Sequence, residues 1–518
     1  MRDTSHVDLA QLMSRLRSAG VQLRADDDRL VLDAPRGSMD DALLALVREH
    51  KRDLLRMLTE AGAGHARRAV SRIPPAPPAA TYPLSHGQER LYFTQLLYPD
   101  SVTYQLPDVL RLDGPVDPAH IERVLNELVR RHEGFRTGFD LDGDEPVATV
   151  HEDVTLRLEH VHDPDFAPEG PGGTGDFVHP FDLEHPPLLR ARLVTVRPDL
   201  HYLLTDKHHL VFDAASRPLF ARDFVRAHRG EPLGPLPVGY KDFAVWQRRL
   251  DGPELRRMGE YWDSVFASEP RVDLAPAQLH PELFGSESRR AHVEFDAGRT
   301  AALRAFCQFR GLTTAMFLQA VYHLAVHRFT GQGEVVIGFP VDVRADAGLD
   351  DQLGLFVNTV PVRSFPEPTL TFTEFAASVR DGILAGLDHS QYPYDAIVER
   401  ACSRRNVSED PLVDGFFNMV SADPQARSPW ADADLAEVVG DPRAALPELP
   451  CLTCRLDLTL SVLEAPDSLR LELDCTTALL EQRTVERIAA DLAFVVDAVV
   501  EAPDTPLGAL AGAVEEAT

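Results

Sequence analysis

The chain has 518 residues, of which 44% are hydrophobic and 26% charged, as in soluble globular proteins of two to four domains. Its 52 Lys and Arg against 81 Asp and Glu give a net charge of −29, which argues against nucleic acid or an anionic membrane as a partner. Without a long apolar run or an apolar signal-peptide core near the N-terminus, the sequence predicts a cytoplasmic location.

Residues 1–60 form the first predicted unit. Apolar residues at helical spacing precede Gly20, and two short apolar runs at 21–23 and 30–32 flank an Asp-rich segment that is typical of a hairpin turn. The ligand spacing of a calcium loop is missing there, so turn chemistry is favoured. Ser38 can cap a further Leu-rich helical stretch. So small a unit has little core, and a bound partner or a dimer would stabilise it.

Residues 61–80 are predicted to be a linker, because the Pro- and Ala-rich run at 73–80 cannot form a helix. Beyond it, strand patterns alternate with helical ones in two α/β halves, 81–265 and 266–515, with a cleft between them as the expected place for chemistry. In the first half, strands are expected at 109–112, 189–194 and 202–205, and helices at 121–131 and 215–228. In the second, helices are expected at 300–309 and 314–329, and strands at 335–339, 358–362, 456–463 and 469–475. No Gly-rich phosphate loop is found.

The cysteines and histidines give no strong metal pattern. Five cysteines over this length do not make a disulfide framework, and Cys451 and Cys454 are a lone C-x-x-C pair that leads into an alternating strand pattern. No metal site is therefore expected.

A pair of histidines ends one predicted strand, in the run His-His-Leu-Val-Phe-Asp at residues 208–213. An imidazole beside a carboxylate on a tight loop suits acyl transfer, in which an amine or hydroxyl loses a proton as it attacks a carbonyl. The alternative is a structural histidine pair with Asp213 capping the next helix. This run alone leaves both interpretations open.

Seven short motifs follow one another from residue 82 onward, and in their order and residues the chain resembles the condensation domains of nonribosomal peptide synthetases. The motifs lie at residues 82–92, 131–139, 208–214, 240–246, 353–359, 389–395 and 411–419. The resemblance implies an α/β (α+β) fold of two chloramphenicol-acetyltransferase-like lobes in a V with a central tunnel. It also implies that donor and acceptor carrier proteins bring substrates on 4′-phosphopantetheine arms, with no cofactor bound to this chain.

The resemblance also implies roles for individual residues. His209 is the expected catalytic residue, removing a proton from the attacking nitrogen or positioning it, while His208 is a structural neighbour pointing the other way off the strand. Asp213 is expected to pair with Arg344 of the second lobe. Asn358 would aid positioning, although a strand-edge amide bonding the backbone is an equal alternative.

Three further positions belong to the predicted tunnel or loop region: Ala214, Tyr240 and Trp246. Ala214 and Val343 stand where the family usually has glycine, and both departures bear on substrate scope more than on activity.

The N-terminal unit resembles the small docking domains that grip the C-terminal tail of an upstream synthetase subunit, and it is a possible dimer contact. Charge complementarity on its predicted turn is expected to guide docking, through Arg24, Asp26, Asp27, Asp28 and Arg29.

Three functions are compatible with the sequence. The first is peptide-bond formation by a condensation domain behind a docking domain. The second is the same fold forming an ester, or an amide with a free amine. The third is a non-catalytic recruitment platform. Epimerisation is disfavoured because it is expected behind a carrier domain, heterocyclisation because it needs an aspartate in place of the histidines, and a lipid-starter role because the front unit is expected to dock an upstream protein.

Overall fold

The computed structural model describes residues 22–26, 29–33, 47, 73–167, 176–249, 252–268, 288–344, 349–401, 412–421, 458–476 and 480–510. The chain separates into two compact units, one formed by Met1–Arg72 with Asp346–Gly348 and the other by Ile73–Ala345 with Leu349–Thr518. In the first unit, β1 (Gln22–Asp26) pairs antiparallel with β2 (Arg29–Asp33). The predicted hairpin is therefore confirmed.

The N-terminal lobe of the second unit is built on a four-stranded sheet in the order β4-β9-β8-β7. Its strands are β4 (Asp108–Asp113), β7 (Glu159–His162), β8 (Leu189–Arg197) and β9 (Leu200–Lys207). Only the β7–β8 pair is parallel among these neighbours. Strand β9 is buried along almost its whole length, so the segment that follows it starts from a rigid position inside the lobe.

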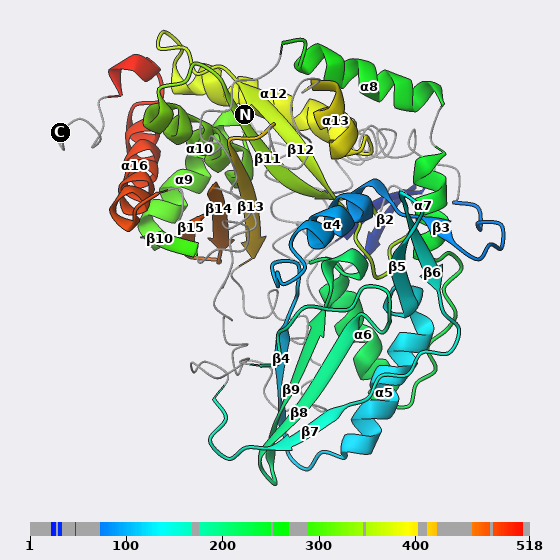
Figure 1. Cartoon of the computed structure of the whole chain (residues 1–518). Helices are drawn as coiled ribbons and strands as arrows, with labels where there is room; N and C mark the ends of the chain where they lie inside the picture. Colours follow the sequence, from blue (N-terminus) through cyan, green and yellow to red (C-terminus); the bar gives the residue numbers. More distant parts are fainter. Residues whose placement is uncertain are drawn as a thin grey trace. The chain divides into compact units, whose positions relative to one another are not determined.

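Two amphipathic helices, α5 (Pro118–Arg131) and α6 (Ser216–His228), pack against each other and lie along this sheet (Figure 1). Helix α5 begins where proline is tolerated, and the Asp117 carboxylate accepts a hydrogen bond from the Ala119 N–H at 3.0 Å. Helix α6 starts three residues after Asp213, so the histidine motif is held between a central strand and a packed helix.

A smaller sheet with the order β3-β6-β5 completes the lobe. Its strands are β3 (Tyr82–Pro83), β5 (Thr137–Asp142) and β6 (Glu145–Val150). The accompanying helices are α4 (His86–Leu97), α7 (Tyr240–Arg248) and the 3₁₀ turns η1 (Glu133–Arg136) and η2 (His209–Val211). Ser85 and Gln88 form a reciprocal capping box that starts α4.

The C-terminal lobe contains a six-stranded sheet in the order β10-β15-β14-β13-β11-β12, with β11, β13 and β14 mutually parallel. Its strands are β10 (Ser288–Phe295), β11 (Val335–Asp342), β12 (Val357–Ser364), β13 (Gly415–Ser421), β14 (Leu458–Glu464) and β15 (Leu469–Thr476). The helices that share its apolar core are α9 (Ala297–Arg310), α10 (Thr314–Thr330), α12 (Phe372–Asp388) and α16 (Gln482–Glu501).

A second apolar cluster on this lobe involves α8 (Pro253–Val265) and α13 (Tyr394–Ala401). Trp262 of α8 packs there with Val336 and Val360 of the sheet, so α8 is anchored to the C-terminal lobe although it directly follows α7 in the chain. The last 3₁₀ turn is η4 (Leu507–Ala509).

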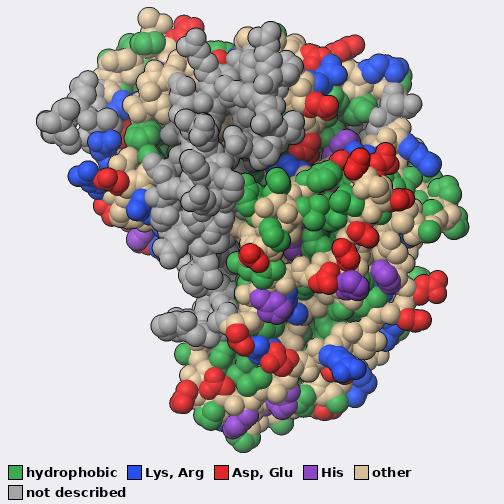
Figure 2. Space-filling model, in the orientation of Figure 1, with side chains coloured by type: hydrophobic (Ala, Val, Ile, Leu, Met, Phe, Trp, Pro, Cys, Tyr) green, Lys and Arg blue, Asp and Glu red, His purple; other side chains and the backbone are tan. Residues whose placement is uncertain are grey.

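The predicted alternation of helices and strands is confirmed in both lobes, with element ends shifted by zero to three residues. Within the described residues, no helix is long and apolar enough to cross a membrane. On the face of the molecule shown in Figure 2, acidic and basic side chains are interspersed.

Candidate active site

The two adjacent histidines have different environments. Strand β9 ends at Lys207, and the chain then turns into η2. His208 is 1% exposed; its Nδ1 accepts a hydrogen bond from the Leu210 N–H at 3.1 Å, and its ring packs edge-on against Phe181. His209, at the start of η2, is half-buried. Of the pair, His209 is therefore the histidine with more access to solvent and reactants.

The imidazole of His209 is held by the backbone. Its Nδ1 lies 2.6 Å from the Phe212 carbonyl oxygen, which can only accept, so Nδ1 carries the hydrogen. In the neutral ring, Nε2 then has the lone pair. The backbone N–H of His209 donates to the Tyr104 carbonyl at 2.8 Å. The orientation and tautomer of the imidazole are thus set by the local backbone.

Of the two interpretations that the run at 208–213 allows, the geometry of Asp213 is that of the structural one. Asp213 is 2% exposed, and its oxygens accept hydrogen bonds from the second lobe and from the start of α6. The Ser216 N–H and Oγ–H donate to Oδ1 at 2.9 and 2.8 Å, and the Phe356 N–H donates to Oδ2 at 2.9 Å. Asp213 therefore binds the first residue of α6 and joins two lobes, while the Phe212 carbonyl lies beside the imidazole of His209.

Arg344 completes this buried node. It contacts both oxygens of Asp213, with Nη2 2.6 Å from Oδ1 and Nη1 2.8 Å from Oδ2, and it is 3% exposed. Burial lowers the pKa of Arg344, but the carboxylates of Asp213 and Asp342 outweigh burial and raise it. Its other donors reach four oxygen acceptors, on Asp342, Ser216, Gln352 and Gly354. The predicted Asp213–Arg344 pair thus forms, and it is a fully hydrogen-bonded ion pair between the lobes.

Sequence reasoning missed Ser216, whose hydroxyl bridges both partners of the ion pair. Its Oγ donates to Asp213 and accepts from Arg344 at 2.8 Å and from the Gly354 N–H at 3.1 Å. The spacing of three residues from Asp213 is that of a helix-capping pair and was the available signal. Gly354 itself leaves no room for a side chain, because a Cβ there would lie 2.3 Å from the Tyr240 ring.

The two other predicted loop residues, Tyr240 and Trp246, lie on α7. Tyr240 is buried; its hydroxyl donates to the Leu355 carbonyl at 2.7 Å and lies 2.9 Å from Ser85 Oγ. Burial raises the pKa of the Tyr240 hydroxyl, which keeps it neutral. Trp246 is half-buried and contacts Phe243 at a ring distance of 5.9 Å. Tyr240 joins the lobes, whereas Trp246 contacts its own helix, and neither contacts the His209 ring in any described interaction.

Asn358 of β12 bonds the backbone of the sixth sequence motif. Its Nδ2 donates to the carbonyls of Ser390 and Tyr392 at 2.7 and 2.8 Å, and its Oδ1 accepts from the Tyr394 N–H at 3.1 Å. This geometry is the strand-edge alternative, with both amide atoms engaged in holding residues 390–394.

The departures from glycine occupy different environments. Ala214 is exposed in the turn that precedes α6, and its carbonyl accepts from the Arg217 N–H at 3.2 Å. Val343 is 5% exposed, and its N–H donates to the Phe356 carbonyl at 3.1 Å. The added methyl of Ala214 is therefore at the surface, and the larger Val343 side chain is part of the core.

Two buried charged residues precede the histidines on β9. Lys207 Nζ lies 2.5 Å from an Asp108 oxygen, and burial lowers the pKa of this lysine. Asp206 is fully buried, 3.6 Å from Arg190, and burial raises its pKa to about 7 in spite of that arginine. Neither residue was predicted, because a charged pair inside an alternating strand is read as exposed.

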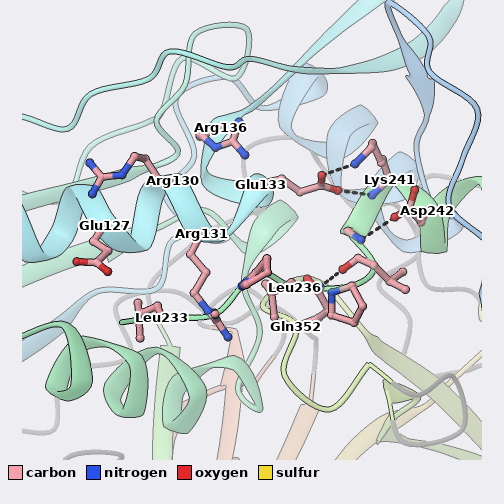
Figure 3. A pocket seen from close by; sticks show the side chains of 15 residues that line it. Glu127, Arg130, Arg131, Glu133, Arg136, Leu233, Leu236, Lys241, Asp242 and Gln352 are labelled. Carbon is pink, nitrogen blue, oxygen red and sulfur yellow. Dashed lines mark hydrogen bonds and ion pairs between the residues drawn. The ribbon is translucent and has the colours of Figure 1, made fainter. Parts of the chain in front are cut away.

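A polar pocket of about 500 Å³ lies at another place, between the end of α5, η1 and residues 233–239 (Figure 3). Much of its charged lining is engaged within the fold. Lys241 lies 2.5 Å from a Glu133 oxygen, and Asp242 accepts from the Gly239 N–H at 2.7 Å. None of its lining residues belongs to the 208–214 motif.

The side chains of the predicted docking residues lie outside the described part of the structure. Asp27 and Asp28 lie outside the described residues, and Arg24, Asp26 and Arg29 are described only as backbone positions of the β1–β2 hairpin. Cys451 and Cys454 also lie outside the described residues.

Sequence comparison links both parts of the chain to known families. Residues 79–517 match the condensation-domain family, and residues 9–60 match the TubC N-terminal docking domain. Bacitracin synthase 2 of Bacillus licheniformis is 27% identical over 501 residues, which are 96% of this chain and 19% of that synthase. The chain thus spans about a fifth of the length of this relative.

Solved structures share the fold at low sequence identity. The X-domain from teicoplanin biosynthesis, in its complex with OxyB, has a TM-score of 0.73 at 22% identity and covers 86% of this chain and 99% of its own. The first condensation domain of the calcium-dependent antibiotic synthetase, with a substrate analogue, has a TM-score of 0.63 at 17% identity and covers 84% of this chain and 99% of its own. Together with the match over residues 79–517, these findings show that the chain belongs to the condensation-domain family of nonribosomal peptide synthetases, with a TubC-type docking segment at its N-terminal end.

Proposed function

We propose that the chain transfers an acyl or peptidyl group from the thioester of an upstream carrier protein to the α-amine of an aminoacyl thioester on a second carrier. The orientation of His209 carries this proposal. Its half-buried imidazole is fixed through Nδ1 by the Phe212 carbonyl at 2.6 Å, which leaves Nε2 as the basic nitrogen.

The reaction balances with this one base. As the amine nitrogen attacks the thioester carbonyl, Nε2 of His209 takes the proton that the nitrogen loses. The C–N bond forms, the C–S bond breaks, and the departing thiolate of the donor arm receives the proton back from the imidazolium. The thioester is already activated, so holding the reactants in line supplies a large part of the rate, up to about 7–11 kcal/mol.

The partners follow from the same proposal. Both reactants arrive on 4′-phosphopantetheine arms, through the tunnel that the family resemblance implies, and no cofactor resides in the chain. The docking segment recruits the C-terminal tail of an upstream synthetase subunit, and it also offers a dimer contact. The match of residues 9–60 to docking domains supports this assignment.

The first test uses two loaded carrier proteins and intact-protein mass spectrometry. With the wild type, the acceptor carrier gains the mass of the donor acyl group. His209→Ala lowers the transfer rate by about 10²–10⁴, the range for loss of a general base. His160→Ala is the matched control, because His160 is an exposed histidine of β7. Equal rates for His209→Ala and wild type would contradict the general-base role and leave positioning as the source of the rate.

Acceptors with a hydroxyl or a free amine distinguish ester or free-amide formation from transfer to a carrier-bound amine. If only these acceptors gain the acyl group, the chain forms esters or free amides and the carrier-bound amine is not its substrate. A complete lack of transfer, with carrier binding retained, would favour a recruitment platform. That function is a real alternative because the teicoplanin X-domain, solved in complex with OxyB, shares this fold.

A further inference from the structure

Tyr104 lies directly opposite His209. Strands β4 and β9 pair antiparallel with Asp108 across from Thr205, and the isolated bridge between Gln105 and His208 continues the same register. The next pair in that register is Tyr104 with His209, and the His209 N–H donates to the Tyr104 carbonyl at 2.8 Å. Tyr104 lies in the turn just before the bridged Gln105 and His209 begins η2 just after the bridged His208, so the backbone hydrogen bond and the ring contact place the two side chains beside each other.

The two rings are also in contact range. The phenol of Tyr104 lies 6.3 Å from the imidazole of His209, centroid to centroid, with the planes tilted by 55°. Both residues are half-buried. The imidazole is therefore constrained twice, by the Phe212 carbonyl at Nδ1 and by the Tyr104 ring beside it.

Side-chain amides of neighbouring residues hold the backbone on both sides of Tyr104. Gln95 Nε2 donates to the carbonyls of Tyr98, Pro99 and Ser101 at 3.1–3.2 Å. Gln105 Nε2 donates to the His179 carbonyl at 2.6 Å. Truncating the Tyr104 side chain thus removes the ring contact and leaves the carbonyl that binds His209 in place.

We propose that Tyr104 is a positioning residue for the transfer reaction: its ring fixes the rotamer of His209 so that Nε2 faces the attacking nitrogen. This inference rests on the proposed function of His209. A small displacement of a reacting group has a large effect on rate, so the ring acts on the chemical step and not on carrier binding. The proposal assigns this role to the ring, which Tyr104→Phe retains.

Steady-state transfer between loaded carriers tests the kinetic part. Tyr104→Ala lowers kcat by about 2- to 10-fold, the equivalent of one aromatic contact, while KM for each carrier stays within about twofold. Tyr104→Phe restores the wild-type kcat. Tyr98→Ala is the control, because Tyr98 is a half-buried tyrosine on the same connection. A rise in KM alone, a failure of Tyr104→Phe to restore kcat, or an equal loss in Tyr98→Ala would overturn the proposal.

A second measurement does not depend on activity. In the full chain with ¹⁵N-labelled histidine, the His209 signals are identified by their loss in His209→Ala. The wild type shows the Nδ1–H tautomer, which the Phe212 carbonyl holds in every variant, and Tyr104→Ala shifts or broadens the ring signals while Tyr104→Phe does not. Unchanged signals in Tyr104→Ala would overturn the proposal. Changed signals in a chain that transfers no acyl group would support the positioning role of Tyr104 and contradict the proposed transfer function. Failure of one proposal is therefore distinguishable from failure of the other.

Discussion

Two buried aspartates, Asp206 and Asp213, bracket the histidine pair and have opposite environments. Asp213 accepts two guanidinium N–H groups of Arg344, two groups of Ser216 and one backbone N–H. Asp206, seven residues earlier, is fully buried with its nearest guanidinium nitrogen at 3.6 Å, and burial raises its pKa to about 7.

The two aspartates differ in their hydrogen-bond donors: Arg344, Ser216 and the Phe356 N–H donate to Asp213, whereas the nearest guanidinium nitrogen to Asp206 is 3.6 Å away and burial dominates its pKa. Asp213 sits where a loop, a helix start and the second lobe all present N–H groups. Asp206 sits inside β9, where burial raises its pKa and the charges of Arg190 and Lys207, with the backbone N–H groups of Leu106 and Lys207, offset that rise only in part. His209 lies between these two and is tied to neither carboxylate by a described hydrogen bond; a backbone carbonyl sets its orientation.

The largest effect on stability is expected when the side chain of Arg344 is removed. Arg344→Leu leaves Asp213 buried without its charged partner and is expected to lower the free energy of unfolding by about 3–5 kcal/mol. Urea unfolding followed by fluorescence measures this loss. Arg197→Leu removes an exposed arginine paired with Asp199 at 2.8 Å and should cost no more than about 1 kcal/mol.

The double variant Arg344→Leu with Asp213→Leu sharpens the result. It removes the uncompensated charge, so part of the lost stability should return. If Arg344→Leu and Arg197→Leu had the same free energy of unfolding, the buried ion pair would contribute nothing to stability.

The pH dependence of stability probes Asp206. Because its folded pKa is raised to about 7, its contribution to stability is fully present below its unfolded pKa near 3.8 and is lost as the pH rises through about 7. Relative to Asp206→Asn, the wild type should lose on the order of 1 kcal/mol per pH unit between pH 5 and 7, and nothing further above pH 8. Unfolding midpoints of both proteins at pH 5, 6, 7 and 8 measure this. A constant difference between them would mean that Asp206 is charged in the fold at every pH.

The smallest effect is expected for a neutral hydrogen bond at the same lobe junction. Tyr240→Phe removes the donor to the Leu355 carbonyl and should cost about 1 kcal/mol, less than the charged node beside it. Tyr322→Phe removes a comparable buried bond, to the Leu458 carbonyl at 3.2 Å, inside the C-terminal lobe. If bonds across the junction matter to the reaction, only Tyr240→Phe also slows acyl transfer. Equal transfer rates in both variants would confine Tyr240 to a structural role.

Much of this molecule follows from local sequence patterns. Periodicity places α10 and β9 within three residues of their ends, since each buries its apolar residues regularly. The hairpin β1–β2 follows from two apolar runs around an Asp-rich turn. The run at 208–213 marks the candidate site, and the family resemblance pairs Asp213 with Arg344, 131 residues away.

Other features were decided by contacts between segments that are far apart in sequence. The Phe212 carbonyl contacts the His209 imidazole, while Arg344 and the Phe356 N–H arrive from the second lobe and bind Asp213. Burial of Asp206 and the placement of Tyr104 opposite His209 depend on strand register. A sequence specifies which groups are able to react; the long-range hydrogen bonds of the folded chain determine which neighbour each group meets, because every buried donor and acceptor must find a partner.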